Sequence, residues 1–176
     1  MDLYLEPHAE SPVPEGRHVN VAVARKGGTL DIAYVIEGST ERLTIPPPAK
    51  PCRTDGLWRS TCLELFARGP GSEYYEFNFA PSTEWAAYRF SGRREGMAPL
   101  ALDAPPRINV SDKGYALIVS VQLEGLGSGP LSVGLSAVVA EKDGTISYWA
   151  LKHPQGAPDF HDPACFALEL PAPNAA

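Results

Sequence analysis

Two alternating segments on either side of a short turn decide the fold of this chain, and they read Thr61-Cys62-Leu63-Glu64-Leu65-Phe66-Ala67-Arg68 and Glu73-Tyr74-Tyr75-Glu76-Phe77-Asn78-Phe79-Ala80. Side chains of a β-strand point alternately to opposite faces, so Leu63 and Leu65 share one face while Glu64 and Phe66 share the other. In the second segment one face is apolar, and the opposite face carries Tyr74, Glu76 and Asn78. Two neighbouring strands therefore place Glu64, Glu76 and Asn78 on one sheet surface.

Strand patterns continue on both sides of this pair, whereas helical periodicity is almost absent. Further strands are predicted for residues 19–24, 30–36, 84–90, 107–111, 115–123, 131–141, 145–152 and 164–170. Gly27-Gly28 and Asp143-Gly144 predict tight hairpin turns, because glycine tolerates a positive φ. Sixteen Gly and 18 Pro suit many short strands joined by turns. The pattern predicts an all-β fold, an antiparallel sandwich of jelly-roll or carbohydrate-binding-module type with about ten to eleven strands.

The chain length indicates one domain, because 176 residues allow a sizeable core but not two ordinary domains. We expect this domain to span residues 1–170, followed by a frayed tail at 171–176. The Pro-rich stretch at 45–51 is expected to cross the surface as a stiff connection, since neither side of it is long enough to fold alone.

Charge and hydropathy exclude several classes of partner. The net charge is −6 and no long run of Lys or Arg offsets it, so nucleic-acid binding is not expected. No stretch approaches the roughly 18 apolar residues of a membrane helix, so no membrane partner is expected. The first 15 residues are acidic and lack signal-peptide features, and an odd count of three Cys favours reduced thiols. We therefore expect a cytoplasmic location.

The residues that could bind a ligand combine flat aromatic rings with planar polar groups. A sugar stacks its apolar face on a ring and gives its hydroxyl groups to carboxylates, amides and cations. The candidate ligand-binding residues are Trp58, Glu64, Glu76, Asn78, Trp85, Tyr88, Arg89, Trp149 and Lys152. The alternatives stay open, because buried Trp side chains also fill sandwich cores and a strand carboxylate also faces water.

Catalysis is not expected. Glu64 and Glu76 could form a glycosidase pair only with a fixed separation and one raised pKa, and the sequence establishes neither. The segment at 153–162 holds two His and two Asp, but their spacing matches no strong zinc pattern. We expect a Pro-rich loop pinned by hydrogen bonds there, with no metal site and no cofactor.

Several segments together resemble the DOMON-like domains related to family 9 carbohydrate-binding modules, namely residues 57–66, 75–82, 85–88, 147–153 and 158–161. The resemblance implies a jelly-roll sandwich with one concave face and a bound ligand, a sugar in one branch and haem in another. In the sugar branch two aromatic rings clamp a sugar, which implies Trp58 and Trp149 here, with Trp85 as the substitute. In the haem branch Met and His bind the iron, which implies Met97 with His161 or His153.

The expected function is that of a non-catalytic module that binds a small molecule, a carbohydrate or sugar derivative, on a concave sheet face. The first alternative is a haem-binding or redox module that uses Met97 and His161. The second alternative is a protein-interaction domain whose aromatic face docks a protein partner.

Overall fold

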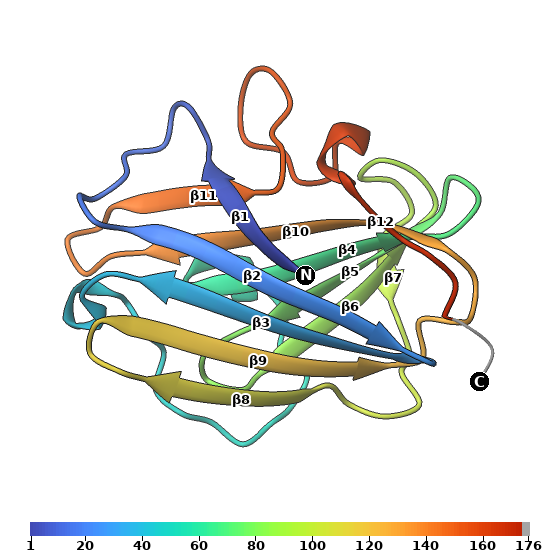
Figure 1. The fold of residues 1–176 in the computed structure, drawn as a ribbon, viewed down its shortest axis with the longest axis horizontal. Helices are drawn as coiled ribbons and strands as arrows, with labels where there is room; N and C mark the ends of the chain where they lie inside the picture. The colour runs from blue at the N-terminus through green and yellow to red at the C-terminus, as the bar shows by residue number, and fades with distance from the viewer. Residues whose placement is uncertain (174–176) are drawn as a thin grey trace.

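The computed structural model describes residues 1–173, and these residues form twelve strands and three short 3₁₀ helices (Figure 1). The strands are β1 (Asp2–Pro7), β2 (His18–Lys26), β3 (Thr29–Glu37), β4 (Cys62–Arg68), β5 (Tyr74–Phe79), β6 (Trp85–Phe90), β7 (Ala98–Pro99), β8 (Arg107–Asp112), β9 (Ala116–Glu124), β10 (Leu131–Ala140), β11 (Ile146–Ala150) and β12 (Leu168–Leu170). The helices are η1 (Thr40–Arg42), η2 (Leu57–Arg59) and η3 (Pro163–Cys165). None of the described helices is long and apolar enough to cross a bilayer.

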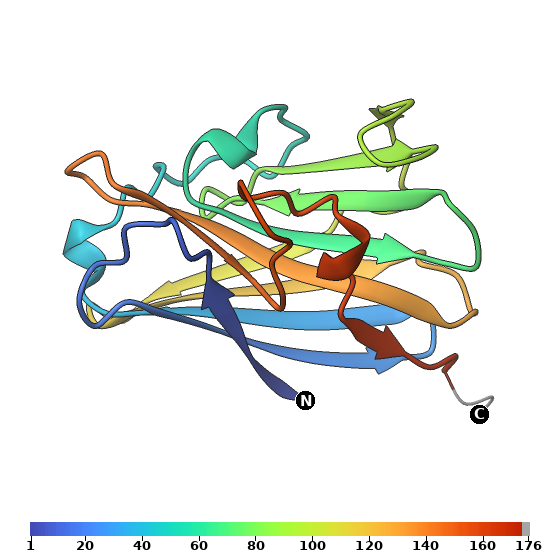
Figure 2. The ribbon, with the colours of Figure 1, turned by 90° about the horizontal axis from the view of Figure 1, so that it is seen from above.

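The strands form two antiparallel layers, which the view from above in Figure 2 separates. The first sheet has the order β1-β2-β3-β9-β8, and the second has the order β7-β6-β5-β4-β10-β11 with β12 also paired to β10. Strand β1 belongs to both layers. Its first part pairs with β2, where Leu3 lies opposite Val21, and its last part pairs with β11, where Glu6 lies opposite Ala150. The all-β sandwich expected from the sequence is therefore confirmed.

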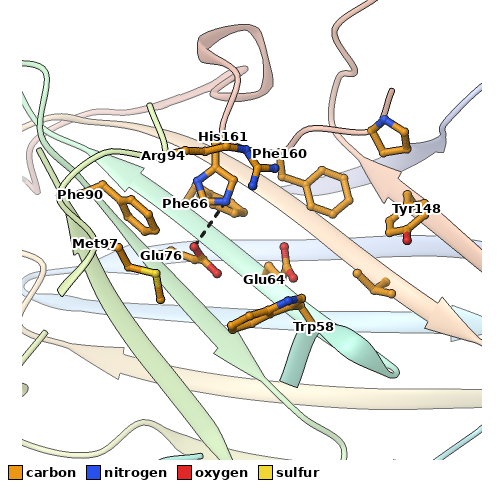
Figure 3. A pocket seen from close by; sticks show the side chains of 12 residues that line it. Trp58, Glu64, Phe66, Glu76, Phe90, Arg94, Met97, Tyr148, Phe160 and His161 are labelled. Carbon is orange, nitrogen blue, oxygen red and sulfur yellow. Dashed lines mark ion pairs between the residues drawn. The ribbon is translucent and has the colours of Figure 1, made fainter. Parts of the chain in front are cut away.

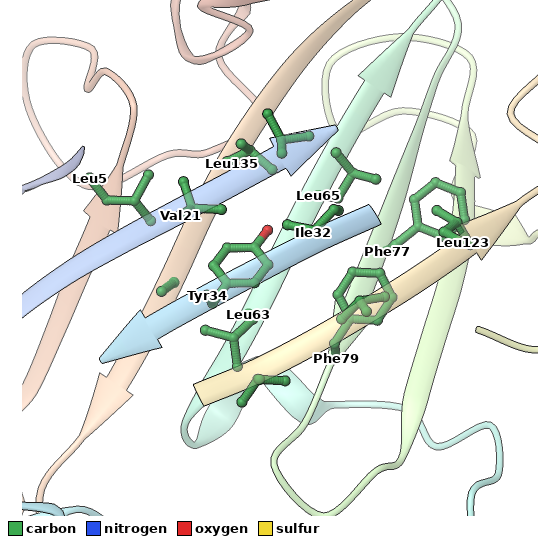
Figure 4. Packing of buried hydrophobic residues seen from close by; sticks show 14 of the residues in the cluster. Leu5, Val21, Ile32, Tyr34, Leu63, Leu65, Phe77, Phe79, Leu123 and Leu135 are labelled. Atoms are coloured by element: carbon green, nitrogen blue, oxygen red, sulfur yellow. The ribbon is translucent and has the colours of Figure 1, made fainter. Parts of the chain in front are cut away.

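The core lies between the inner faces of the two sheets (Figure 4). Strand alternation sends Leu63 and Leu65 of β4 and Phe77 of β5 inward, against β2, β3 and β9. One hydrogen bond crosses this core, because the buried Tyr34 hydroxyl of β3 donates to the backbone oxygen of Glu64 at 2.6 Å. That contact satisfies a hydroxyl group that would otherwise be costly to bury.

The ten strands predicted from the sequence are all present, and two more, β1 and β7, were missed. Strand β1 buries only Leu5, so its apolar pattern is weak. Strand β7 has two residues, one of them Pro99, as suits an edge strand. The predicted strand at 164–170 is shorter than expected, because Asp162 caps η3 and only Leu168–Leu170 pairs with β10.

Both predicted hairpin turns are confirmed. Lys26 pairs with Thr29 around Gly27, whose φ is 55°, and Asp143 accepts a hydrogen bond from the Thr145 amide beside Gly144. The tail expected to fray at 171–176 lies partly outside the described residues.

A second apolar cluster covers the outer face of the second sheet. It includes Phe66, Tyr74 and Phe90 from the strands, and Phe160 and Phe166 from residues 151–167. We call residues 151–167 the C-terminal segment. Because this segment lies over β4 and β10 instead of leaving the sheet open to water, it encloses a space above the strands.

Candidate functional site

A pocket of about 340 Å³ opens on the outer face of the second sheet (Figure 3). Its lining comes from Trp58, Glu64, Phe66, Glu76, Phe90, Arg94, Met97, Val138, Tyr148, Pro158, Phe160 and His161. The strands supply the floor, η2 supplies Trp58, the β6–β7 connection supplies Arg94 and Met97, and the C-terminal segment supplies the opposite wall. The volume falls in the range of small-molecule sites.

Two glutamates form the polar part of the floor. Glu64 of β4 lies opposite Asn78 of β5, and Glu76 lies two residues before Asn78 on the same strand. The outward faces of the two strands thus carry both carboxylates, 3% and 6% exposed, into one pocket. The sequence prediction that Glu64, Glu76 and Asn78 share one sheet surface is confirmed.

The carboxylates are held by few hydrogen bonds. Glu76 Oε1 accepts from the Asn78 amide at 2.7 Å, and Glu64 Oε2 accepts from the Ser136 hydroxyl at 3.2 Å. Burial and the neighbouring Glu76 raise the pKa of Glu64 to about 8, and burial also raises the pKa of Glu76. At neutral pH the Glu64 carboxyl therefore holds a proton and can donate a hydrogen bond into the pocket.

His161 faces the same floor from the opposite wall. Its Nδ1 is 2.8 Å from the Tyr74 hydroxyl, which also accepts from the Arg94 amide, so the Tyr74 proton goes to Nδ1. The ring proton then lies on Nε2, 3.7 Å from Glu76 Oε2. Burial and the nearby Arg94 lower the pKa of His161 to about 4, so His161 is a neutral donor in this site.

Ion pairs and histidine hydrogen bonds hold the C-terminal segment, which forms one wall of the pocket, in place. Asp159 accepts hydrogen bonds from the guanidinium groups of both Arg93 and Arg94, at distances of 2.6 to 3.1 Å. These cations lower the pKa of Asp159 against the opposing effect of burial. Farther along, His8 bonds to the Gly156 carbonyl, and His153 bonds to the Glu6 carbonyl. The loop expected at 153–162 is therefore pinned by hydrogen bonds, and the described residues contain no cluster suited to a metal ion.

Trp58 forms the facing wall and is 38% exposed. Its ring meets Tyr88 edge-on, with centroids 6.2 Å apart, and the Tyr88 hydroxyl donates to Asp55 just before η2. Tyr88 therefore supports Trp58 from behind. The position of Trp58 across the pocket from Phe160 leaves a slot between aromatic surfaces (Figure 3).

Six of the nine residues proposed from the sequence do not line this pocket: Asn78 and Tyr88 only contact the lining residues Glu76 and Trp58, and the other four lie elsewhere. Trp149 and Trp85 point into the core between the sheets, 2% and 8% exposed. The clamp of Trp58 and Trp149 is therefore not formed: Trp149 lies beside Ala137 and donates to the Ser147 hydroxyl. Trp85 packs under Arg53, whose guanidinium carbon lies 4.8 Å from its ring. Arg89 borders another hollow and Lys152 is exposed; neither lines this pocket.

Sequence reasoning missed much of the wall. The alternation of β4 places Phe66 beside Glu64, and the alternation of β11 allows only one of Tyr148 and Trp149 to face the pocket. Here it is Tyr148. Arg94, Pro158 and Phe160 come from connections, where no periodicity predicts direction. Met97 and His161, proposed only for haem, both line the pocket.

No family model and no curated protein sequence matches this chain. Solved structures do match. A "putative carbohydrate-binding protein" from Bacteroides uniformis superposes with a TM-score of 0.65 and 12% identity, over 94% of this chain and 83% of that chain.

A family 9 carbohydrate-binding module from Caldicellulosiruptor kristjanssonii matches in two complexes. With glucose bound, the TM-score is 0.50 at 8% identity, covering 86% of this chain and 76% of that chain. With cellotriose bound, the TM-score is 0.51 at 8% identity, covering 87% and 74%. At these identities the likeness concerns the fold: this chain has the sandwich fold of a family 9 carbohydrate-binding module, as the sequence resemblance implied. The DOMON part of that resemblance stays a prediction.

Proposed function

We propose that the protein is a non-catalytic module that binds a carbohydrate or sugar derivative in the pocket on its second sheet. The observation that carries the proposal is the pairing of two buried carboxyl groups with facing aromatic walls in one pocket of sugar-ring size. The fold supports it, because structures of the same fold hold glucose and cellotriose.

The chemistry of the pocket suits a ring with hydroxyl groups. The Trp58 indole offers a flat apolar surface, and Phe160 and Tyr148 offer others across the space. Glu76 accepts hydrogen bonds, while protonated Glu64 and His161 Nε2 donate them, so vicinal hydroxyls find partners of both kinds. The raised pKa of Glu64 meets one of the two requirements for a glycosidase pair, so turnover of aryl glycosides that vanishes in Glu64→Gln would contradict the non-catalytic proposal.

Isothermal titration calorimetry with glucose, cellotriose and a panel of other mono- and disaccharides tests the proposal. We expect saturable binding of at least one sugar, weakened at least about tenfold by Glu76→Gln. The exposed Glu169→Gln on β12 is the matched control. If no sugar binds the folded protein, or if Glu76→Gln binds as the wild type does, the proposal fails.

Haem remains the second candidate, on the single observation that Met97 and His161 line the same pocket. The ligand types fit iron, but a pocket of about 340 Å³ is near the small end for drug-sized ligands, and a porphyrin is larger than most of these. A haemin titration followed by absorption spectroscopy separates the candidates. Stoichiometric haem binding that is lost in both Met97→Ala and His161→Ala would replace the sugar proposal.

A further inference from the structure

The pocket combines two carboxyl groups with aromatic walls, and this combination narrows the class of ligand. Glu64 Oε2 has one hydroxyl partner, Ser136, and the structure gives Glu64 Oε1 no protein partner among the described residues. Glu64 is nonetheless 3% exposed and lines the pocket. A carboxyl oxygen that opens into a pocket without a protein partner is available to accept a hydrogen bond from a ligand.

The cations near the carboxylates are already engaged. Arg94 is bound by Asp159, whose Oδ1 accepts from Nε at 3.1 Å and from Nη2 at 2.9 Å. His161 has its Nδ1 occupied by Tyr74 and faces Glu76 only through Nε2 at 3.7 Å, beyond hydrogen-bond distance. The titratable or charged groups on the pocket side of Glu64 are Glu76 from β5, Cys62 from β4 and Arg94 from the β6–β7 connection, with His161 across the pocket. Tyr34 of β3 meets the Glu64 backbone from the core side. Of these only Arg94 is positive at neutral pH.

The walls add a second feature that favours a cation. Trp58, Phe66, Tyr148 and Phe160 surround the two carboxylates (Figure 3). The faces of aromatic rings attract cations, most strongly when water is excluded. A neutral sugar would use the same rings for stacking, but it would gain nothing from the negative charge that the two carboxyl groups can carry beside a bound cation.

We propose that the preferred ligand carries a protonated amine, as an amino sugar does, and that this ammonium group lies between Glu64 and Glu76. The inference rests on the proposed sugar-binding function and specifies it. The ammonium would donate to Glu64 Oε1 and to Glu76 Oε2, the two oxygens that the protein leaves without a hydrogen bond. The sugar ring would then stack on Trp58.

Glucosamine, glucose, N-acetylglucosamine and glucuronic acid provide the test, because they differ in charge on a common ring. Calorimetry at pH 7 should show glucosamine binding about tenfold or more tighter than glucose, with N-acetylglucosamine near glucose and glucuronic acid weakest. Because Glu64 is protonated at pH 7, glucosamine binding should release up to about one proton. Titrations in two buffers of different ionisation enthalpy measure that release.

Glu64→Gln keeps the size of the side chain and removes its charge. It should lower the preference for glucosamine over glucose about tenfold and abolish the proton release, whereas Glu169→Gln should change neither. If glucose and glucosamine bind equally, or if the preference survives Glu64→Gln, the ammonium site is wrong while sugar binding stands. If none of the four sugars binds, the ammonium site is wrong, and the sugar-binding proposal fails as well when cellotriose and the disaccharides do not bind either.

Discussion

Glu64 shows how a single side chain can couple the pocket to pH. A carboxyl group with its pKa raised to about 8 keeps its proton in the folded state after the unfolded chain has lost it. The raised pKa of Glu76 acts in the same direction. Stability therefore falls as the pH rises from the unfolded carboxyl pKa to about 8.

We predict that this fall is clearest between about pH 6.5 and pH 8. Below that window His161, with its pKa lowered to about 4, acts in the opposite direction, because the unfolded chain takes up a proton there that the folded chain refuses. Thermal unfolding at half-unit steps should give a slope of up to about 1.4 kcal/mol per pH unit in the wild type. Glu64→Gln should flatten the slope; a slope equal to that of the wild type would contradict the raised pKa.

A second prediction compares two tryptophans that lie in different environments, one on the pocket wall and one in the core. Trp58→Ala should weaken sugar binding about tenfold or more while costing about 1 kcal/mol of stability, since the side chain is half exposed on the pocket wall. Trp149→Ala should instead cost about 3–5 kcal/mol, because it opens a cavity in the core.

Denaturant unfolding and calorimetry on both variants measure the two effects. The reverse pattern, with Trp149→Ala stable and defective in binding, would restore the Trp58–Trp149 clamp that the sequence resemblance implied.

Among the secondary-structure elements, the contact of β10 with η3 controls the pocket wall. A Cβ on Gly134 would lie 2.9 Å from the Cys165 backbone oxygen and 3.6 Å from Phe66 Cβ. Gly134 thus lets the C-terminal segment approach the sheet closely. An added methyl group must push this segment outward or distort β10.

We predict that Gly134→Ala destabilises the protein by about 1–3 kcal/mol and weakens sugar binding, because Phe160 and His161 move with the segment. Gly69→Ala, where an added Cβ meets nothing within 4 Å, is the control. Thermal unfolding and limited proteolysis of residues 151–167 report the change. Equal stability and equal protection in the two variants would show that the segment is not held by this contact.

The strands and their turns were predictable from the sequence, because alternation and glycine turns are local signals. Glu64, Glu76 and Asn78 could be placed on one surface for the same reason. The direction in which the β11 side chains point could not be predicted, since Tyr148 and Trp149 are both large aromatics. The direction follows from the register with β10, where Trp149 lies opposite the core residue Ala137. The positions of Arg94, Phe160 and the other residues from connections depend on contacts between distant segments, such as that of Arg94 with Asp159. Such contacts produce no periodic pattern in the sequence.

At the scale of the whole molecule, a buried ion pair joins three connections. Arg17 lies 2.9 Å from Glu141 and also donates to the backbone oxygens of Glu37 and Ser39. Both charged side chains are almost fully buried. The loop before β2 is thereby fixed to the end of β3 and to the β10–β11 turn.

We predict that Arg17→Met destabilises the protein by about 3–5 kcal/mol, because Glu141 is left buried without its cation. The double variant Arg17→Met/Glu141→Met should recover part of the loss. Arg107→Met, which removes an exposed pair with Glu124 at 3.9 Å, should cost less than about 1 kcal/mol. Denaturant unfolding measures all three; additive losses in the double variant would mean that the two charges do not interact.

The membership of β1 in both sheets has a consequence for the order of folding. Its first residues meet β2 soon after both have been made, but Glu6 bonds to His153, a partner 147 residues away. Closing so long a loop is entropically costly, and folds dominated by such distant pairings form slowly. We therefore expect the β2–β3 and β4–β5 hairpins to form first and the pairing of β1 with β11, which connects the two sheets, to form late. The wall of the pocket would be completed only in that last step.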